Sequence, residues 1–189
     1  MRSPVRFTVL QAALALACAL PAAAQVAPQA GSLSADLLAD ITDVEKKFVD
    51  LAKAIPADKY EWRPGAGVRS VNDVVLHVAA DNYLIPAAIG FTPDAATGIK
   101  GDDYKTAMAF EQRKMSKDSA IAELEKSFVF LKQSLQGTSA AKMGDQVKLF
   151  GQPFTMQRAW ILGTTHLHEH LGQLIAYART NGVKPPWSR

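Results

Sequence analysis

Cysteine is almost missing from this chain of 189 residues, in which Cys18 is the only one. It lies in an N-terminal stretch that we expect to be removed, so the mature protein would carry no thiol. A disulfide framework and a cysteine nucleophile are then excluded, and any metal site has to use nitrogen and oxygen ligands. The sequence also lacks a Gly-rich phosphate loop, an internal repeat and a run of heptads, so it carries no motif for those classes of protein.

Acidic residues are missing before Asp36, and the same stretch predicts a secretory signal peptide over residues 1–24. Two arginines supply its positive start, and residues 8–20 form an apolar segment too short to span a bilayer comfortably. Small residues then lead up to Ala24, after which we expect cleavage. We therefore expect a periplasmic or secreted protein with no stable membrane insertion after cleavage.

Two other interpretations of this N-terminal stretch stay open. Lipid modification at Cys18 would make the protein an anchored lipoprotein, although Ala15–Leu16–Ala17 is a poor version of the bacterial lipobox. The stretch could also be an apolar helix of the folded domain. The order of arginines, apolar residues and alanines disfavours that interpretation.

Neither sign of charge is in clear excess once the signal peptide is removed. The whole chain has 21 basic and 18 acidic residues. Arg2 and Arg6 would leave with residues 1–24, so 19 basic residues would face 18 acidic ones, a net charge of +1. This balance gives no evidence for nucleic acid or an acidic membrane as a partner. The remaining length fits one domain, which we place at residues 34–189 after a linker over residues 25–33.

Four long stretches have apolar residues at helical spacing, which predicts an all-α protein. The expected helices cover about 34–55, 70–88, 116–136 and 155–181. Ser70, Ser116 and Thr155 are expected to cap the last three, because each precedes an apolar-periodic run. Pro86 is expected to kink or end the second helix.

The connections between the expected helices differ in length. Residues 91–114 form a long irregular link, in which a short helix is expected to begin near Tyr104. This length is what a four-helix bundle needs for a crossover between non-adjacent helices. Residues 147–154 read as one turn with extended flanks.

Histidine is scarce, yet three of the four histidines stand at positions 166, 168 and 170. His166 and His170 are one turn apart and share a helix face, so their imidazoles can bind one metal ion. His77, in another amphipathic stretch, would be the third ligand. Three protein ligands with an open position are typical of a reactive metal site. His168 points roughly the opposite way and is not expected to join them.

The simpler interpretation of these histidines is that they are hydrogen-bonded core residues. The helix around them is largely apolar, and an imidazole beside its core face is unfavourable unless something satisfies it. Asp81 follows His77 by four residues, so it could accept a hydrogen bond from the ring nitrogen that does not bind metal, or it could be solvated. Gln173 could position a ligand or transfer a proton, and Trp62 could wall the site, although packing is the simpler role for both.

Two sets of short motifs support the metal interpretation. The first set is Trp62–Arg63–Pro64, Arg69–Ser70–Val71 and His77–Val78–Ala79–Ala80–Asp81–Asn82–Tyr83. The second set is His166-x3-His170–Leu171–Gly172–Gln173 and the terminal run 182–188. In their order, and over about residues 34–188, they resemble the DinB / YfiT-like metal-dependent superfamily. The resemblance implies a DinB-like four-helix bundle with a long crossover connection and a divalent metal ion (Zn, Ni or Fe) held by His77, His166 and His170.

The resemblance also implies a range of functions. Characterised relatives include thiol-dependent S-transferases and a thiol-dependent maleylpyruvate isomerase, so we expect a metal-dependent hydrolase or a thiol S-transferase. Its partner would be a small-molecule substrate or a thiol, and the sequence leaves open a homodimer. A non-catalytic periplasmic metal- or ligand-binding protein is the alternative, and a metal-free bundle with structural histidines is a third. The predicted export argues against the thiol version, because low-molecular-weight thiols belong to the cytoplasm.

Overall fold

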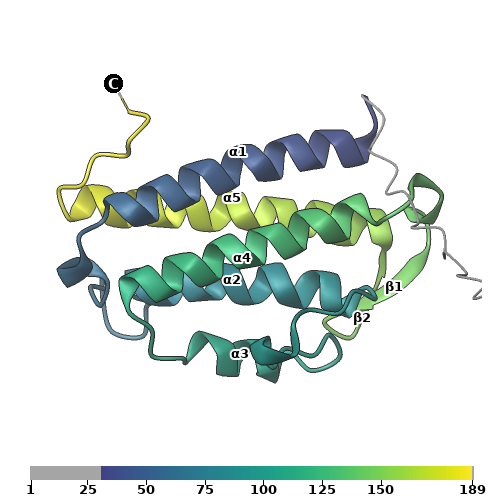
Figure 1. Ribbon diagram of the computed structural model, residues 1–189, viewed down its shortest axis with the longest axis horizontal. Helices are drawn as coiled ribbons and strands as arrows, with labels where there is room; N and C mark the ends of the chain where they lie inside the picture. Colours follow the sequence, from purple (N-terminus) through teal and green to yellow (C-terminus); the bar gives the residue numbers. More distant parts are fainter. Residues whose placement is uncertain (1–30, 189) are drawn as a thin grey trace, which may run out of the picture.

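The computed structural model of the protein describes residues 31–188. The predicted signal peptide, Cys18 and most of the predicted linker lie outside the described residues. Four long helices form a bundle (Figure 1). They are α1 (Leu33–Ala54), α2 (Val71–Ala88), α4 (Lys117–Gln136) and α5 (Met156–Thr180). None of the helices in residues 31–188 is both long and apolar enough to cross a membrane.

The four long helices form a closed ring of neighbours. α1 packs against α4 and α5, and α2 packs against the same two helices. α1 and α5 run in one direction, and α2 and α4 run in the other (Figure 1). The largest side chains between them are fully buried: Phe48, Leu51, Leu76, Leu124, Phe128, Leu131 and Trp160. Burial of this apolar surface is the main force that holds the helices together.

The long crossover joins α2 to α4 and contains the short helix α3 (Lys105–Glu111). The sequence placed this crossover between non-adjacent helices, and that detail was wrong, because α2 and α4 lie side by side. The link has to be long for a different reason. The two helices are parallel, so the chain must return along the bundle before α4 begins. On this return α3 packs on the outer side of α2 (Figure 1).

The predicted helix starts are confirmed. Ser70 and Asp73 form a reciprocal capping box at the start of α2, with bonds of 3.1 and 2.9 Å. The hydroxyls of Ser116 and Thr155 accept hydrogen bonds from backbone N–H groups in the first turns of α4 and α5. The α2 helix ends at Ala88, two residues after its internal proline. These caps fix where the histidine-bearing helices begin.

A β-hairpin connects α4 to α5. Its strands are β1 (Gln146–Leu149) and β2 (Gln152–Thr155), which pair antiparallel around the turn Phe150–Gly151. The expected turn with extended flanks is therefore confirmed. Both turn residues have positive φ, 51° and 74°, as a two-residue type I′ turn requires. The hairpin contacts both α2 and α5, the two helices that carry the histidines of the site.

Candidate metal centre

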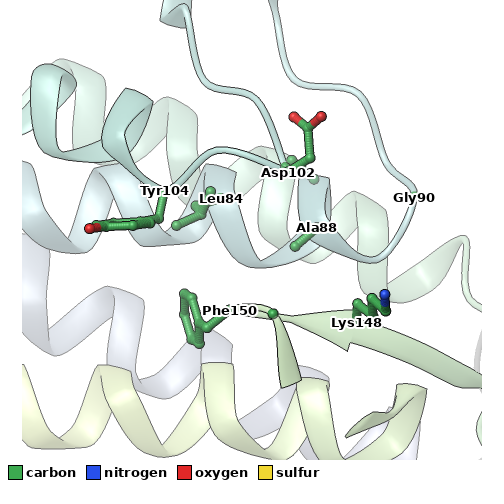
Figure 2. Close-up of a pocket in the computed structure, with 10 residues that line it drawn as sticks. Leu84, Ala88, Gly90, Asp102, Tyr104, Lys148 and Phe150 are labelled. Atoms are coloured by element: carbon green, nitrogen blue, oxygen red, sulfur yellow. The ribbon is translucent and has the colours of Figure 1, made fainter. Parts of the chain in front are cut away.

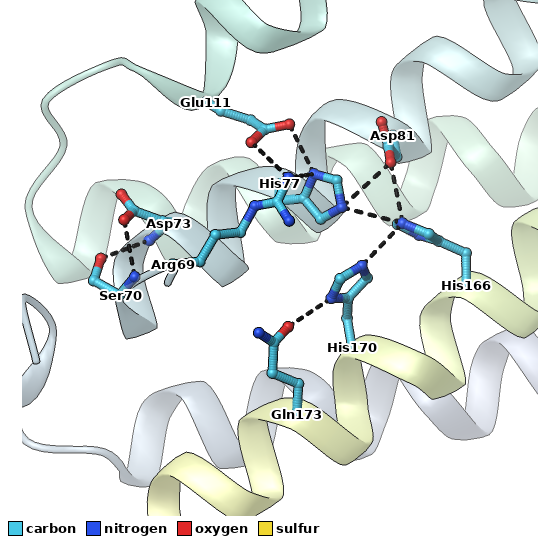
Figure 3. A network of polar contacts seen from close by, with 9 residues as sticks. All are labelled: Arg69, Ser70, Asp73, His77, Asp81, Glu111, His166, His170 and Gln173. Atoms are coloured by element: carbon cyan, nitrogen blue, oxygen red, sulfur yellow. Dashed lines mark hydrogen bonds and ion pairs between the residues drawn. The ribbon is translucent and has the colours of Figure 1, made fainter. Parts of the chain in front are cut away.

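Three histidines from two helices meet inside the bundle. α2 contributes His77, and α5 contributes His166 and His170 (Figure 3). His166 Nε2 lies 3.1 Å from His77 Nε2 and 3.0 Å from His170 Nε2. One nitrogen from each ring lies within 4.8 Å of the others. His77 and His170 are buried, and His166 is half-buried. The three residues that the sequence singled out are therefore brought together.

Two of the three rings are oriented by hydrogen bonds on their far side. His77 Nδ1 lies 2.7 Å from Glu111 Oε1, and His170 Nδ1 lies 2.8 Å from Gln173 Oε1. Both partners are oxygen acceptors, so each Nδ1 donates a proton and each Nε2 keeps its lone pair. A hydrogen bond of this kind fixes the tautomer and the orientation of a metal-binding imidazole. Gln173 thus has the positioning role that its place in the motif allowed.

Glu111 is the functional residue that sequence reasoning missed. It is the last residue of α3, and its second oxygen lies 3.3 Å from Arg69 Nη2. The Arg69 side chain also lies 3.2 Å from His77 Nδ1 (Figure 3). Glu111 has no spacing relation to the histidine motifs that could have revealed it. Arg69 carried one signal, because it stands in the motif Arg69–Ser70–Val71.

Asp81 does not take the role that the sequence proposed for it. One of the two roles left open for Asp81 was a contact with the outer nitrogen of His77, and Glu111 occupies that position. Asp81 Oδ2 instead lies 3.1 Å from His166 Nε2 and 3.6 Å from His77 Nε2. The i, i+4 spacing correctly put Asp81 beside His77, but it did not determine which ring nitrogen the carboxylate faces. Asp81 therefore lies on the inner side of the site, with the three Nε2 atoms.

Burial controls the charges of the site. Burial and the nearby His170 and His77 lower the pKa of His166 to about 3. Burial also lowers the pKa of His170. Burial raises the pKa of Asp81 to about 6, against the opposing effect of His77. Burial by itself would raise the pKa of Glu111 too. The hydrogen bond from His77 and the charge of Arg69 outweigh burial and lower this pKa below its ordinary value.

These donors fit a divalent metal ion. Two Nε2 lone pairs point at His166 Nε2, which can carry at most one proton and so can satisfy only one of them. The carboxylate of Asp81 approaches the same point. Adjacent nitrogens of a tetrahedral zinc site are about 3.3 Å apart, close to the 3.0 and 3.1 Å found here. Without a cation the lone pairs of these converging acceptors repel one another, whereas a cation between them would be coordinated by them.

The other candidates of the motif region lie outside the cluster. His168 is exposed and pairs with Asp40 of α1 at 2.9 Å, so it points away from the cluster, as its position on the helix predicted. Trp62 is partly buried and packs edge-on against Tyr177, with ring centroids 5.4 Å apart. The Tyr177 hydroxyl accepts a hydrogen bond of 2.9 Å from Gln173 Nε2. Trp62 is therefore a packing residue that supports the group holding His170.

A pocket of about 280 Å³ opens beside His77. Its polar lining consists of Arg69, His77, Asp81, Glu111 and Gln112. The rest of its wall is apolar or aromatic and comes from α2, from α3 with Tyr104 before it, and from the turn of the hairpin. The site therefore has a route by which a small molecule can reach His77 and Asp81.

Fold and site together define a helical-bundle protein with a candidate three-histidine metal centre. The chain belongs to the DinB superfamily, because the model of that family matches residues 40–174. No curated protein matches the sequence.

Solved structures share the fold. A DinB-like protein from Bacillus cereus superimposes with a TM-score of 0.66 at 15% identity, over 81% of this chain and 95% of its own. The DinB-like protein YjoA from Bacillus subtilis superimposes with a TM-score of 0.60 at 17% identity, over 79% of this chain and 93% of its own. YfiT from Bacillus subtilis superimposes with a TM-score of 0.63 at 14% identity, over 84% of this chain and 95% of its own. YfiT is described as a probable metal-dependent hydrolase with an unusual four-helix bundle topology. At these identities the likeness confirms the DinB-like four-helix bundle and nothing further.

Proposed function

We propose that His77, His166 and His170 bind one divalent metal ion, and that the protein is a metal-dependent hydrolase or thiol S-transferase acting on a small molecule. One observation carries the proposal: three Nε2 atoms converge while Glu111 and Gln173 hold the outer nitrogens of two of the rings. The description of YfiT as a probable metal-dependent hydrolase supports the same reaction class. Imidazole ligands suit Zn, Ni and Fe alike, so the donors do not select one of them.

His77, His166 and His170 would hold a divalent cation as neutral ligands, so the cation would keep its full charge and would make a water or thiol at the site more acidic, which would supply a nucleophile at neutral pH. Asp81 is the group best placed to accept the released proton, because its Oδ2 faces the same space as the three Nε2 atoms. Arg69 lines the pocket and is partly exposed, so it can contact a polar group of the substrate.

The hydrolase is the better supported of the two reactions. The only cysteine of the chain is Cys18, so a thiol nucleophile would have to come from outside the protein. We also propose that the protein acts in the periplasm or outside the cell, on the evidence of its N-terminal sequence. Such a location would separate it from the cytoplasmic thiol pool, whereas water is available everywhere.

Cobalt substitution tests the reaction class. The metal-free protein is loaded with Co(II), and its visible spectrum is followed first during titration with small thiols and then across pH. A spectral change that titrates near neutral pH, with no response to thiols, is expected for a hydrolase. A thiolate charge-transfer band would favour the transferase instead. A spectrum that is indifferent to both would contradict the enzyme proposal and support a non-catalytic metal-binding protein.

A further inference from the structure

Large apolar side chains are exposed around the pocket beside His77. Tyr104, Met108 and Phe150 are 56%, 54% and 54% exposed, and all three line this pocket. They come from three different parts of the chain: the residue before α3, α3 itself and the hairpin turn. Exposed apolar residues that gather at one place on a soluble protein commonly mark a binding site.

Phe150 has an unusual backbone conformation for its residue type. It is the only non-glycine with positive φ in the described part of the chain, at 51°. The first position of a type I′ turn favours Asn, Asp or Gly, because a bulky side chain is unfavourable in the left-handed region. The ring gains little from packing in return, because more than half of it is exposed. Retained strain of this kind points to a functional role for the side chain.

A second, larger pocket of about 510 Å³ begins where the first one ends. The two share Leu84, Tyr104 and Phe150 as lining residues. Figure 2 shows Tyr104 and Leu84 on one side of the gap and Phe150 on the other. The two pockets adjoin along α2 and together are called the α2 groove below.

Small residues line the far part of the α2 groove, together with the charged Asp102 and Lys148. Ala87, Ala88, Gly90 and Gly101 form much of the second pocket. Gly101 lies so close to the end of α2 that an added Cβ would stand 2.2 Å from Ala87 O. A larger residue there would push the crossover loop away from the helix. The wall of the groove therefore depends on glycine at this position.

We infer that the α2 groove binds a small-molecule substrate with an elongated apolar chain, whose polar reactive end lies at His77 and Asp81. The inference rests on the proposed function and names the substrate class of the same site. Arg69, Asp81 and Glu111 lie at the histidine end of the groove, Asp102 and Lys148 lie at the far end, and the walls that the two pockets share between these ends are apolar or aromatic. Tyr104 and Phe150 lie where the chain leaves the polar end, so they hold it from both sides. Pockets of these volumes are of the size that holds small molecules.

Alkyl hydroxamates of increasing length test the groove in the metal-loaded protein, because their two oxygens bind a divalent metal and their tails vary. From acetohydroxamate to octanohydroxamate we expect the affinity to rise roughly three- to four-fold for each methylene, as for a methylene removed from water. Phe150→Gly should flatten the dependence of the affinity on chain length. The same variant should raise Tm by roughly 2–4 °C, because glycine relieves the strained φ.

Two further variants complete this experiment. Phe150→Asn should behave like the glycine variant, because Asn tolerates positive φ but offers no apolar wall. Val129→Ala is the matched control: Val129 is a large exposed apolar residue on α4 that lines neither pocket, and its change should leave the series as in the wild type. Two results would overturn the inference: hydroxamate affinities that do not depend on chain length in the wild type, or affinities that rise as steeply with chain length in Phe150→Gly as in the wild type.

A second arm separates the groove from the metal. Metal-free protein is titrated with butan-1-ol, hexan-1-ol and octan-1-ol while Tm is followed. Stabilisation that grows with chain length and is lost in Phe150→Gly would support the α2 groove even if no metal binds and the proposed function fails. No dependence on chain length or on Phe150 in this arm would overturn the groove, even if the metal and its hydroxamate complex form as proposed.

Discussion

Glu111 Oε1 lies 2.7 Å from His77 Nδ1, on the side of the imidazole ring opposite the other two histidines. This contact joins the crossover to the bundle, because Glu111 ends α3 and His77 stands in the middle of α2. The same carboxylate lies 3.3 Å from Arg69. A residue from the irregular part of the chain therefore sets the tautomer of a histidine from the regular part.

Replacing this carboxylate should weaken metal binding while the fold is kept. Glu111→Gln removes the negative charge that would make His77 a stronger ligand, so the affinity for Zn is expected to fall roughly 10- to 100-fold. Competition with a chromophoric chelator measures the change. Glu169→Gln is the matched control, because Glu169 is exposed on α5. Equal affinities for Glu111→Gln and the wild type would contradict the positioning role.

Single alanine variants test the ligand set. His77→Ala, His166→Ala and His170→Ala should each lose most of the bound metal on purification, whereas His168→Ala should keep it, because its ring faces Asp40. Elemental analysis measures the occupancy. Unchanged metal content in His166→Ala would refute the assignment.

Metal removal should also destabilise the protein. A ligand that binds only the folded state adds about 2.7 kcal/mol at 100 times its Kd, so a chelator is expected to lower Tm of the wild type. The same chelator should have no effect on Tm of His166→Ala, which has already lost a ligand. An identical response of the two proteins would mean that the shift does not come from this site.

The regular part of this molecule follows from its sequence. Apolar spacing predicts the four long helices, and hydroxyl side chains predict their starts, because both signals arise from local geometry. The pairing of His166 with His170 is equally local, since it depends only on the helical turn. The approach of His77 to this pair is a tertiary contact and does not follow from local geometry. Its place beside the pair was expected from the family resemblance and from its position on an apolar helix.

The rest of the site depends on tertiary contacts that no spacing records. Glu111 reaches His77 only because the crossover packs α3 against α2. For Asp81 the sequence left two roles open, a hydrogen bond to the outer nitrogen of His77 or a solvated carboxylate. Spacing determines the helix face but not which ring nitrogen a neighbouring side chain contacts. Phe150 gave no signal in the sequence, because its significance comes from a turn conformation that phenylalanine rarely adopts.

Export is open to a direct test, because it concerns residues outside the described part of the chain. The order of arginines, apolar residues and alanines predicts removal of residues 1–24. Intact-mass analysis of protein from the periplasm or the medium should therefore give the mass of a chain that begins at Gln25. Full-length protein in the cytoplasm would contradict the prediction. A lipid found on Cys18 would show instead that the protein is an anchored lipoprotein.

Asp81 should make the stability of the metal-free protein depend on pH. Burial raises the pKa of its carboxyl group from 3.8 to about 6, so the folded state holds this proton more tightly than the unfolded state does. The stability linked to this group is fully present below pH 3.8 and is lost as pH rises to about 6. The loss is on the order of 2–3 kcal/mol, because the side chain is only 14% exposed and one pKa unit corresponds to about 1.4 kcal/mol.

The variant Asp81→Asn has no such proton to lose. Without metal, urea unfolding at pH 7.5 should therefore find it more stable than the wild type, whereas at pH 4 the difference should disappear. Asp43→Asn, on the exposed side of α1, is the control and should follow the wild type at both pH values. With metal bound, the stability difference between Asp81→Asn and the wild type at pH 7.5 is expected to become smaller or to change sign, because the carboxylate of the wild type then lies beside a cation. Parallel pH profiles for Asp81→Asn and the wild type without metal would show that Asp81 is not held in this environment.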